Sequence, residues 1–458
     1  MSSIASTGST NHKLRPRSSP DAAGQPAQAA RRRAVSRRAW LWLAAVSAAA
    51  ILLLHAAWRP PPDGLSLAID AATAGRRFDL TTWTLNSVAS KLGDAVDKPA
   101  AELAEAQATQ MVRAWLERAQ QASELSSQIE RTYADPAVTD AAAATAAQRA
   151  ELAALRQQLN AEASTVEAIL EQQMSVILQA EGLQRAGLVW PPVRMRFNEP
   201  PQLLVVSPRD RIQRLRAVDL EPGMDSAGRA ALEQEIAQQE NVAAYVTGIG
   251  GYGVYPTMVI DRFGLPWTAD TIAHEWIHNY LAFQPLGWAM LEGGEHVTIN
   301  ETVASIAGEE LGRALLTRYY PDLLPPPEPP VQTPDEAETP LNEPQPFEFG
   351  PEMRATRLVV DELLAGGYVE EAEAFMEARR KTFAEHGYYL RVLNQAYFAF
   401  HGSYATGAAA SDPIGPKLEQ LRALSPSLQA FLQTAAKLTS VQALDAALAQ
   451  LESPDTLP

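Results

Sequence analysis

Residues 271–281 read TIAHEWIHNYL and contain the pattern H-E-x-x-H, formed by His274, Glu275 and His278. On a helix, four residues turn the chain through about 400°, so the two histidines share one face and can bind a single metal ion. Glu275 lies about 100° around the helix, beside the ion rather than in line with the two ligands. The pattern therefore predicts two metal-binding histidines and a glutamate that accepts a proton from metal-bound water.

The sequence around this motif predicts the helix that the pattern needs. Pro266 is typical of a first helical turn, Thr268 can cap that turn, and Asp270 is favoured at the positive end of the helix dipole. Gln284-Pro285 marks the end of the helix. Chance is the alternative explanation, because H-E-x-x-H defines only three positions and occurs in unrelated chains.

A second segment, residues 298–312, reads TINETVASIAGEELG and also predicts a helix. Small residues occupy the face that carries Glu301, namely Ala304, Ser305, Gly308 and Gly312. Small side chains allow two helices to approach closely, so this carboxylate can reach a metal held by the first helix. The alternative is a solvated acid near a helix start, where the dipole favours it. The small-residue face favours a third ligand, which leaves the fourth zinc position open for catalysis.

The motif HEWIH, followed by the glutamate of NETVAS 23 positions after His278, resembles the gluzincin metallopeptidases, the thermolysin-like enzymes. The resemblance covers residues 254–312. It implies a zincin-like catalytic core over residues 190–320 and hydrolysis of peptide bonds in a peptide or protein substrate. It also implies a Zn2+ ion held by His274, His278 and Glu301, with Glu275 as general base.

Two features depart from the gluzincin pattern, and a third agrees with it. Ser305 stands where thermolysin-like enzymes have an aspartate that orients one histidine, so the surroundings of the ligands must differ. The Gly-x-Met-Glu-Asn signature of one aminopeptidase group is absent from GIGGYGVYPT, residues 248–257. Residues 250–260 match the edge strand that pairs with substrate in this family, with an ordinary core strand as the alternative.

Stabilisation of the developing oxyanion needs a further hydrogen-bond donor, usually a tyrosine or histidine from a later helix. The aromatic segment 386–404 offers several, and we favour Tyr404 or His401. His296 is another candidate. The alternative for most of these aromatic residues is a core stripe, because they have helical spacing.

The chain of 458 residues is 46% hydrophobic, has a formal net charge of −16 and contains no cysteine. The acidic balance argues against a nucleic-acid partner, since phosphate contacts need a basic surface. The absence of cysteine excludes thiolate zinc sites and disulfides, so a metal must be held by His, Asp or Glu.

An uncharged apolar run at residues 39–58 predicts a transmembrane signal-anchor helix. Residues 1–38 predict a disordered cytoplasmic tail, because the first 30 are rich in Ser, Pro, Ala and Gln. The basic residues of this tail keep it in the cytoplasm by the positive-inside rule, which exports everything after Trp58. We therefore expect a single-pass protein of the cell membrane with an extracytoplasmic catalytic domain. A cleaved signal peptide is the alternative, but the run is longer than a typical h-region and no A-x-A-like site follows it.

The remaining sequence predicts an α+β fold that is mostly helical, with a small edge sheet. Residues 78–187 have helical spacing, with breaks at Asp97-Lys98-Pro99 and Asp135-Pro136. This region is either a partner-binding stalk or a plain support for the catalytic core. Short strands are expected at residues 193–207, and one or two more at residues 242–261 with a turn at Gly250-Gly251.

The C-terminal part of the chain begins with an acidic, proline-dense stretch at residues 321–351, which predicts a surface loop. Residues 352–446 return to helical spacing and are expected to complete the peptidase. A competing hypothesis from another class is a catalytically inactive, membrane-tethered scaffold or binding protein that keeps the zincin fold. The presence of Glu275 argues against it, because an inactive protein has no need of that acid.

Overall fold

The structure is a computed structural model that describes residues 63–97, 103–135, 137–239, 241–324 and 347–452. The described residues all belong to one unit, Asp63–Pro458. The expected cytoplasmic tail and transmembrane segment lie outside the described residues, as does most of the proline-dense loop. Within the described ranges, no helix combines the length and the apolar character that crossing a membrane requires.

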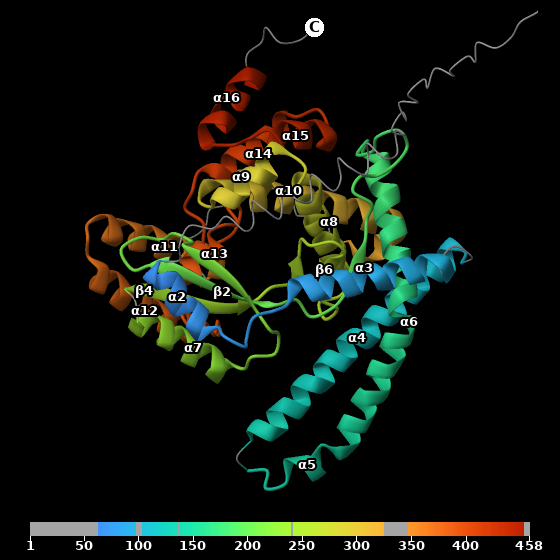
Figure 1. The fold of residues 1–458 in the computed structure, drawn as a ribbon, viewed down its shortest axis with the longest axis horizontal. Helices are drawn as coiled ribbons and strands as arrows, with labels where there is room; N and C mark the ends of the chain where they lie inside the picture. Colours follow the sequence, from blue (N-terminus) through green and yellow to red (C-terminus); the bar gives the residue numbers. More distant parts are fainter. Residues whose placement is uncertain (1–62, 98–102, 136, 240, 325–346, 453–458) are drawn as a thin grey trace, which may run out of the picture. The chain divides into compact units, whose positions relative to one another are not determined.

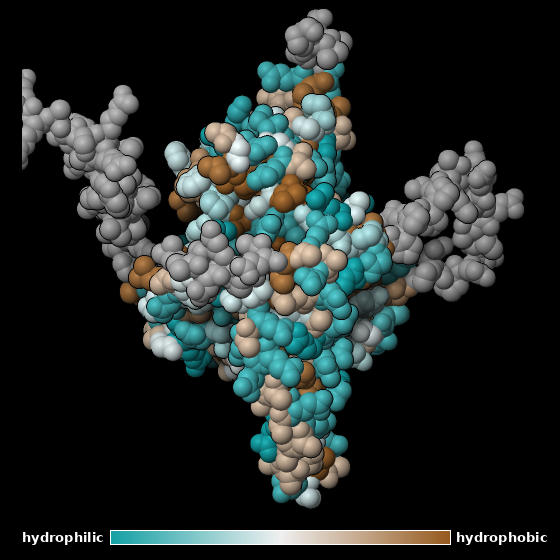
Figure 2. All heavy atoms as spheres, turned by 90° about the vertical axis from the view of Figure 1, so that its right-hand side faces the viewer, coloured by the Kyte–Doolittle hydropathy of each residue, from teal (hydrophilic) through white to brown (hydrophobic). Residues whose placement is uncertain are grey.

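The N-terminal part is helical, and two of its helices end at the predicted breaks. Its helices are α2 Gly64–Ala72, α3 Leu80–Asp97, α4 Glu105–Ala134, α5 Ala141–Ala144 and α6 Ala146–Ala180. The long helices α4 and α6 pack side by side and are connected through α5 (Figure 1). Trp115 is buried between them, and its Nε1 donates a hydrogen bond to the carbonyl of Leu159 at 2.9 Å. The outer surface of this pair is mainly hydrophilic, with pale, weakly hydrophobic positions toward its lower tip (Figure 2).

This helical region shares a single hydrophobic core with the helices of the metal motif. Trp115 of α4 and Met174 of α6 belong to the same buried cluster as Ile272 and Leu311. Helices that bury their apolar faces against the motif helices stabilise them directly. The continuous core therefore favours the support interpretation of this region over an independent stalk.

The first of two three-stranded sheets is antiparallel, with β2 (Gln202–Pro208) between β3 (Arg216–Leu220) and β4 (Val242–Gly248). Helix α7 (Ser226–Gln239) packs against β4. The sequence analysis missed β3. Its residues are partly exposed rather than strictly alternating, so periodicity gave no strand signal there.

The second sheet has the order β1 (Met195–Phe197), β6 (Thr257–Val259) and β5 (Gly251–Tyr252). Strand β1 runs parallel to β6, and β5 runs antiparallel to it. Residues 242–261 thus form three strands rather than the predicted one or two. They belong to different sheets, because the segment after β4 carries the chain from the first sheet to the second.

Two buried glutamates of α6 take the place of a further strand beside β1. Glu167 accepts a hydrogen bond from the backbone N–H of Phe197, and Glu171 accepts one from Met195, each at 2.9 Å. Lys91 of α3 lies within 2.8 Å of both carboxylates and compensates their burial. The α6 side of the second sheet is therefore closed, while β5 forms its other edge.

The motif helices are α8 (Leu265–Leu281) and α10 (Glu295–Tyr319), separated by α9 (Pro285–Ala289) and the short helix η1 (Met290–Glu292). Helix α8 begins before Pro266, which has no N–H and fits the first turn, so Gly264 is the cap residue. The predicted cap at Thr268 is wrong: its hydroxyl lies inside the helix and donates back to the Gly264 carbonyl at 2.8 Å.

The C-terminal part is helical, as predicted, and begins after the short helix η2 (Pro321–Leu323). Its helices are α11 Phe349–Ala365, α12 Val369–Glu385, α13 Gln395–His401, α14 Ile414–Leu424, α15 Leu428–Ala435 and α16 Val441–Glu452. Helix α13 packs against β2 and β4, which brings the chain that follows it to the metal motif. The described residues thus form an α+β fold dominated by helices, as predicted.

Candidate metal centre

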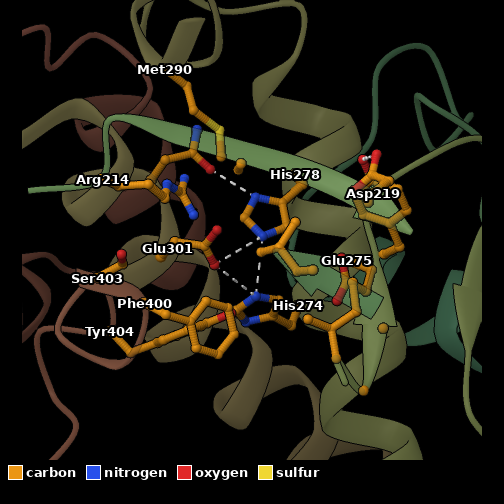
Figure 3. Close-up of a pocket in the computed structure, with 18 of the residues that line it drawn as sticks. Arg214, Asp219, His274, Glu275, His278, Met290, Glu301, Phe400, Ser403 and Tyr404 are labelled. Atoms are coloured by element: carbon orange, nitrogen blue, oxygen red, sulfur yellow. Dashed lines mark hydrogen bonds and ion pairs between the residues drawn. The ribbon is translucent and has the colours of Figure 1, made fainter. Parts of the chain in front are cut away.

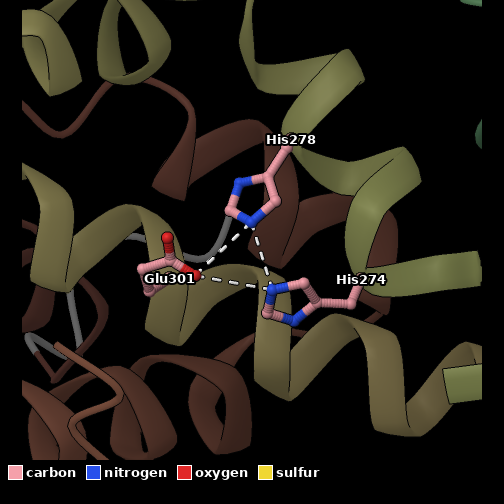
Figure 4. A group of neighbouring side chains, drawn as sticks. All are labelled: His274, His278 and Glu301. Atoms are coloured by element: carbon pink, nitrogen blue, oxygen red, sulfur yellow. Dashed lines mark hydrogen bonds and ion pairs between the residues drawn. The ribbon is translucent and has the colours of Figure 1, made fainter. Parts of the chain in front are cut away.

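Helices α8 and α10 bring His274, His278 and Glu301 together from two segments of the chain (Figure 4). The two Nε2 atoms lie 3.1 Å apart, and each lies 3.5 Å from Oε2 of Glu301. A tetrahedral zinc ion with bonds of about 2.0–2.1 Å has ligand atoms roughly 3.3–3.4 Å apart. The three atoms therefore have the spacing of three ligands of one small ion.

The carboxylate of Glu301 supplies a second sign that the site suits a cation. Its Oε2 is buried and has no hydrogen-bond partner among the described residues. A buried carboxylate oxygen without a donor is costly, and metal coordination is one of the few ways to compensate it. Two imidazoles and a carboxylate suit zinc, so the residues present fit that ion.

The close approach of the two helices depends on the small residues predicted on α10. Ala304, Gly308 and Gly312 are all buried. A Cβ on Gly308 would lie 3.1 Å from N, Cα and Cβ of His274, and one on Gly312 would lie 2.8 Å from the backbone N of Asp270. The backbone of α10 thus rests on that of α8, and this contact places Glu301 within reach of both histidines.

His278 is oriented by a residue that the sequence analysis did not identify. Its Nδ1 lies 2.7 Å from Oδ1 of Asn300, the buried residue just before Glu301. An N–H donated from Nδ1 to this oxygen leaves Nε2 free as a ligand. Ser305, at the position where gluzincins have an orienting aspartate, instead donates a hydrogen bond to the carbonyl of Glu301 at 2.9 Å. The surroundings of the ligands thus differ from the family pattern, as predicted.

His278 and Glu301 shift each other's pKa values in opposite directions. Burial lowers the pKa of His278, but the Glu301 carboxylate outweighs it and raises that pKa to about 9. Burial raises the pKa of Glu301, but His278 and His274 outweigh it and hold that pKa well below its usual range. The carboxylate therefore stays ionised, which is the form that binds a metal.

Glu275 lies beneath the glycine-rich strand β5. A Cβ on Gly251 would overlap its carboxylate and lie 2.8 Å from its Cγ, and one on Gly253 would lie 3.2 Å from its Oε2. Burial raises the pKa of Glu275, although His274 and His278 oppose the shift. A carboxylate with a raised pKa is better matched to proton transfer near neutral pH. The glycines are thus needed because the backbone passes directly over this acid.

A cavity of about 620 Å³ opens over the three ligand residues and Glu275 (Figure 3). Its other walls come from β5, from the segment before β3, from α9 and from the turn after α13. Tyr252 lines it, but its hydroxyl donates to Oδ2 of Asp219 at 2.7 Å. A cavity of this size can hold a few residues of an extended peptide beside β5.

Of the two predicted oxyanion donors, the structure brings only Tyr404 to the cavity. Its ring lies 6.2 Å from that of His274 (Figure 3). The Glu301 carboxylate, then burial, raises the pKa of Tyr404 well above its usual value, so the hydroxyl remains a donor at neutral pH. Chain direction explains the placement: α13 ends at His401, and Tyr404 lies in the turn that follows.

His401 and His296 do not reach the cavity. His401 packs against Tyr397, with ring centroids 4.2 Å apart, and its Nε2 lies 3.4 Å from the hydroxyl of Tyr245. The preference for His401 is therefore corrected: it is one of the aromatic core residues of the alternative explanation. His296 contacts the carbonyls of Gly293 and Thr439 at 3.1 and 2.8 Å.

The chain was compared with protein-family models, curated proteins and solved structures. No protein-family model, curated protein or solved structure matches this chain. The arrangement consists of three converging side chains that could hold a metal ion, an adjacent buried carboxylate, a tyrosine hydroxyl and the edge strand β5. This combination can hold a metal ion, activate water and accept an extended chain.

Proposed function

We propose that this chain is a zinc metallopeptidase of the gluzincin type that hydrolyses peptide bonds. The observation that carries the proposal is the triangle of ligand atoms from His274, His278 and Glu301, with its unpartnered buried oxygen. A structural site usually has four protein ligands, whereas three leave a position for water. The buried Glu275 beside this triangle supports catalysis over storage or structural binding.

Each residue around the site has its own proposed role in hydrolysis. His274, His278 and Glu301 would hold the zinc ion, which would lower the pKa of a bound water and polarise the substrate carbonyl. Glu275 takes the proton from the attacking water and delivers it to the leaving amine. Tyr404 donates its O–H to the oxyanion as the carbonyl becomes tetrahedral. Asn300 holds the ring of His278 in the tautomer that leaves Nε2 free.

Strand β5 is the proposed binding edge for the substrate backbone. It pairs with β6 on one side, and residues 250–253 line the cavity on the other. An extended peptide that adds to this edge places its carbonyls over the metal ligands and next to Glu275. The edge position of β5 supports this role over that of an ordinary core strand.

Membrane attachment through residues 39–58 is part of the proposal. The described region begins at Asp63, five residues after Trp58, so the helix α2 starts close to the end of the apolar run. Protease added to intact cells is expected to release the C-terminal domain. Full protection of that domain would contradict the proposed orientation.

Metal content and cleavage test the catalytic proposal separately. Purified full-length protein is expected to contain about one zinc per chain, and His278→Ala is expected to lose it. Glu275→Gln should retain zinc but lose cleavage of a peptide library, while exposed Glu235→Gln on α7 serves as the matched control. Normal zinc retention in His278→Ala would refute the metal site. Undiminished cleavage by Glu275→Gln would remove that residue from its role.

A further inference from the structure

Arg214 places a positive charge in the cavity, and this charge has no partner among the described residues. It lies in the segment between β2 and β3, two residues before β3 begins, and lines the cavity together with the metal ligands. Figure 3 shows its side chain extending into the cavity on the side of Glu301. The residue is half-buried, so its guanidinium has limited access to bulk water.

The other arginines of this segment have partners, and Arg214 does not. Arg209 binds Glu373 at 2.6 Å, and Arg211 binds Asp210 at 2.9 Å. Among the described residues, Arg214 has neither a hydrogen bond nor an ion pair with any side chain or carbonyl. A guanidinium offers five N–H donors in a planar fork, so this group is available for a ligand.

The acidic groups of the cavity are engaged elsewhere. Glu301 faces the two histidines, Glu275 lies under β5, and Asp219 accepts the hydroxyl of Tyr252. Burial raises the pKa of Tyr252, and the Glu301 carboxylate with burial raises the pKa of Tyr404, while the positive charge of Arg214 opposes both shifts. The guanidinium is therefore close to the space that a bound peptide would occupy.

We propose that Arg214 determines substrate specificity by binding a carboxylate of the peptide, which rests on the proposed peptidase function. A planar guanidinium binds a carboxylate through two parallel hydrogen bonds, and this pairing is strong in a partly desolvated cavity. The carboxylate belongs either to the free C-terminus of a short peptide or to an acidic side chain next to the cleaved bond. In both cases, the substrate supplies the partner that Arg214 lacks.

Peptide binding to a catalytically inactive variant tests the proposal without relying on activity. The probes are pools of fluorescein-labelled tetrapeptides in three forms: a C-terminal acid, a neutral C-terminal amide, and an amide that contains one glutamate. Anisotropy titrations use the zinc-loaded Glu275→Gln protein. One carboxylate-bearing pool is expected to bind about 10- to 100-fold more tightly than the neutral pool. Tighter binding of the C-terminal acid identifies the free C-terminus as the carboxylate, and tighter binding of the glutamate-containing amide identifies an acidic side chain.

Variants of Arg214 assign the preference to this residue. In the same background, Arg214→Gln should abolish the preference, and Arg214→Lys should keep part of it because the charge remains without the fork. Arg211→Gln is the matched control, since Arg211 is exposed and already paired with Asp210. Zinc content and melting temperature establish that each variant is folded.

The outcomes separate this proposal from the peptidase function. Equal binding of the acid and neutral pools, no binding of any pool, or an unchanged preference in Arg214→Gln overturns the role of Arg214. Cleavage that depends on Glu275 but shows no carboxylate preference leaves the peptidase function intact. An Arg214-dependent preference in a protein that cleaves nothing supports the carboxylate site and refutes the peptidase function instead.

Discussion

A methyl group at position 308 is expected to separate the two helices that hold the metal ligands. The added Cβ of Gly308→Ala would lie 3.1 Å from three atoms of His274. Carbon atoms prefer separations of about 3.5–4.0 Å, so α10 must move away by roughly 0.4–0.9 Å. Glu301 lies two turns earlier on the same face of α10 and moves with it. Metal sites tolerate only about 0.2 Å of change in a bond, so zinc affinity should fall.

The size of the effect follows from two opposing contributions. Overpacking costs about 1–3 kcal/mol, whereas replacing a helical glycine by alanine stabilises by about 0.5–1 kcal/mol. The metal-free protein is therefore expected to lose about 0–2.5 kcal/mol of unfolding free energy. Zinc affinity should fall at least about tenfold, because even changes behind the ligands cost about 10- to 100-fold.

Chelator-competition titration measures the zinc affinity, and urea unfolding with and without zinc measures the stability. The matched control is Gly93→Ala in α3, where an added Cβ meets nothing within 4 Å. That variant should be neutral or slightly stabilised and keep its zinc affinity. If Gly308→Ala bound zinc within twofold of the wild type and unfolded at the same urea concentration, the close helix contact would not position Glu301.

Three further predictions follow from buried groups around the site. Gly251→Ala places a methyl against the Glu275 carboxylate, so kcat should fall about 100-fold with zinc content unchanged; a normal kcat in peptide assays would contradict this contact. Burial lowers the pKa of His401 to about 4, below its unfolded value of about 6.5, so folding stability should drop by about 3 kcal/mol as pH falls between these values. Urea titrations should show a weaker pH dependence for His401→Phe, and parallel curves would refute the assignment. Glu167→Ala leaves Lys91 without one of its buried partners and should cost about 3–5 kcal/mol in urea unfolding, so a loss below about 1 kcal/mol would exclude an essential ion pair.

Local spacing was enough to predict that His274, His278 and Glu301 come together, because each rule acts within one helix. The four-residue separation of His274 and His278 defines a face, and the small residues at 304, 308 and 312 define the contact surface of α10. Both inferences depend only on helix geometry. The structure reproduces them even though α10 begins three residues earlier than expected.

Other site residues depend on tertiary packing, which no local period encodes. Arg214 lies two residues before β3, and Asp219 lies near the end of that strand. Both reach the cavity only because β3 pairs with β2. Asn300 could have been identified from the sequence as a partner of His278, because it directly precedes Glu301 on the helix that faces His278. His401 still lies within α13, where its four-residue spacing from Tyr397 brings the two rings together, whereas Tyr404 lies in the turn after the helix.

The N-terminal helices influence the site through the second sheet. Glu167 and Glu171 of α6 hold the backbone of β1, which pairs with β6, and β6 in turn pairs with β5 above Glu275. Each link is a set of backbone hydrogen bonds or a buried carboxylate, so a displacement of α6 would move the strand proposed to bind substrate. A freely hinged stalk would not make such contacts. The helical region between residues 78 and 187 is therefore best understood as a support that positions β5 over Glu275, the proposed general base.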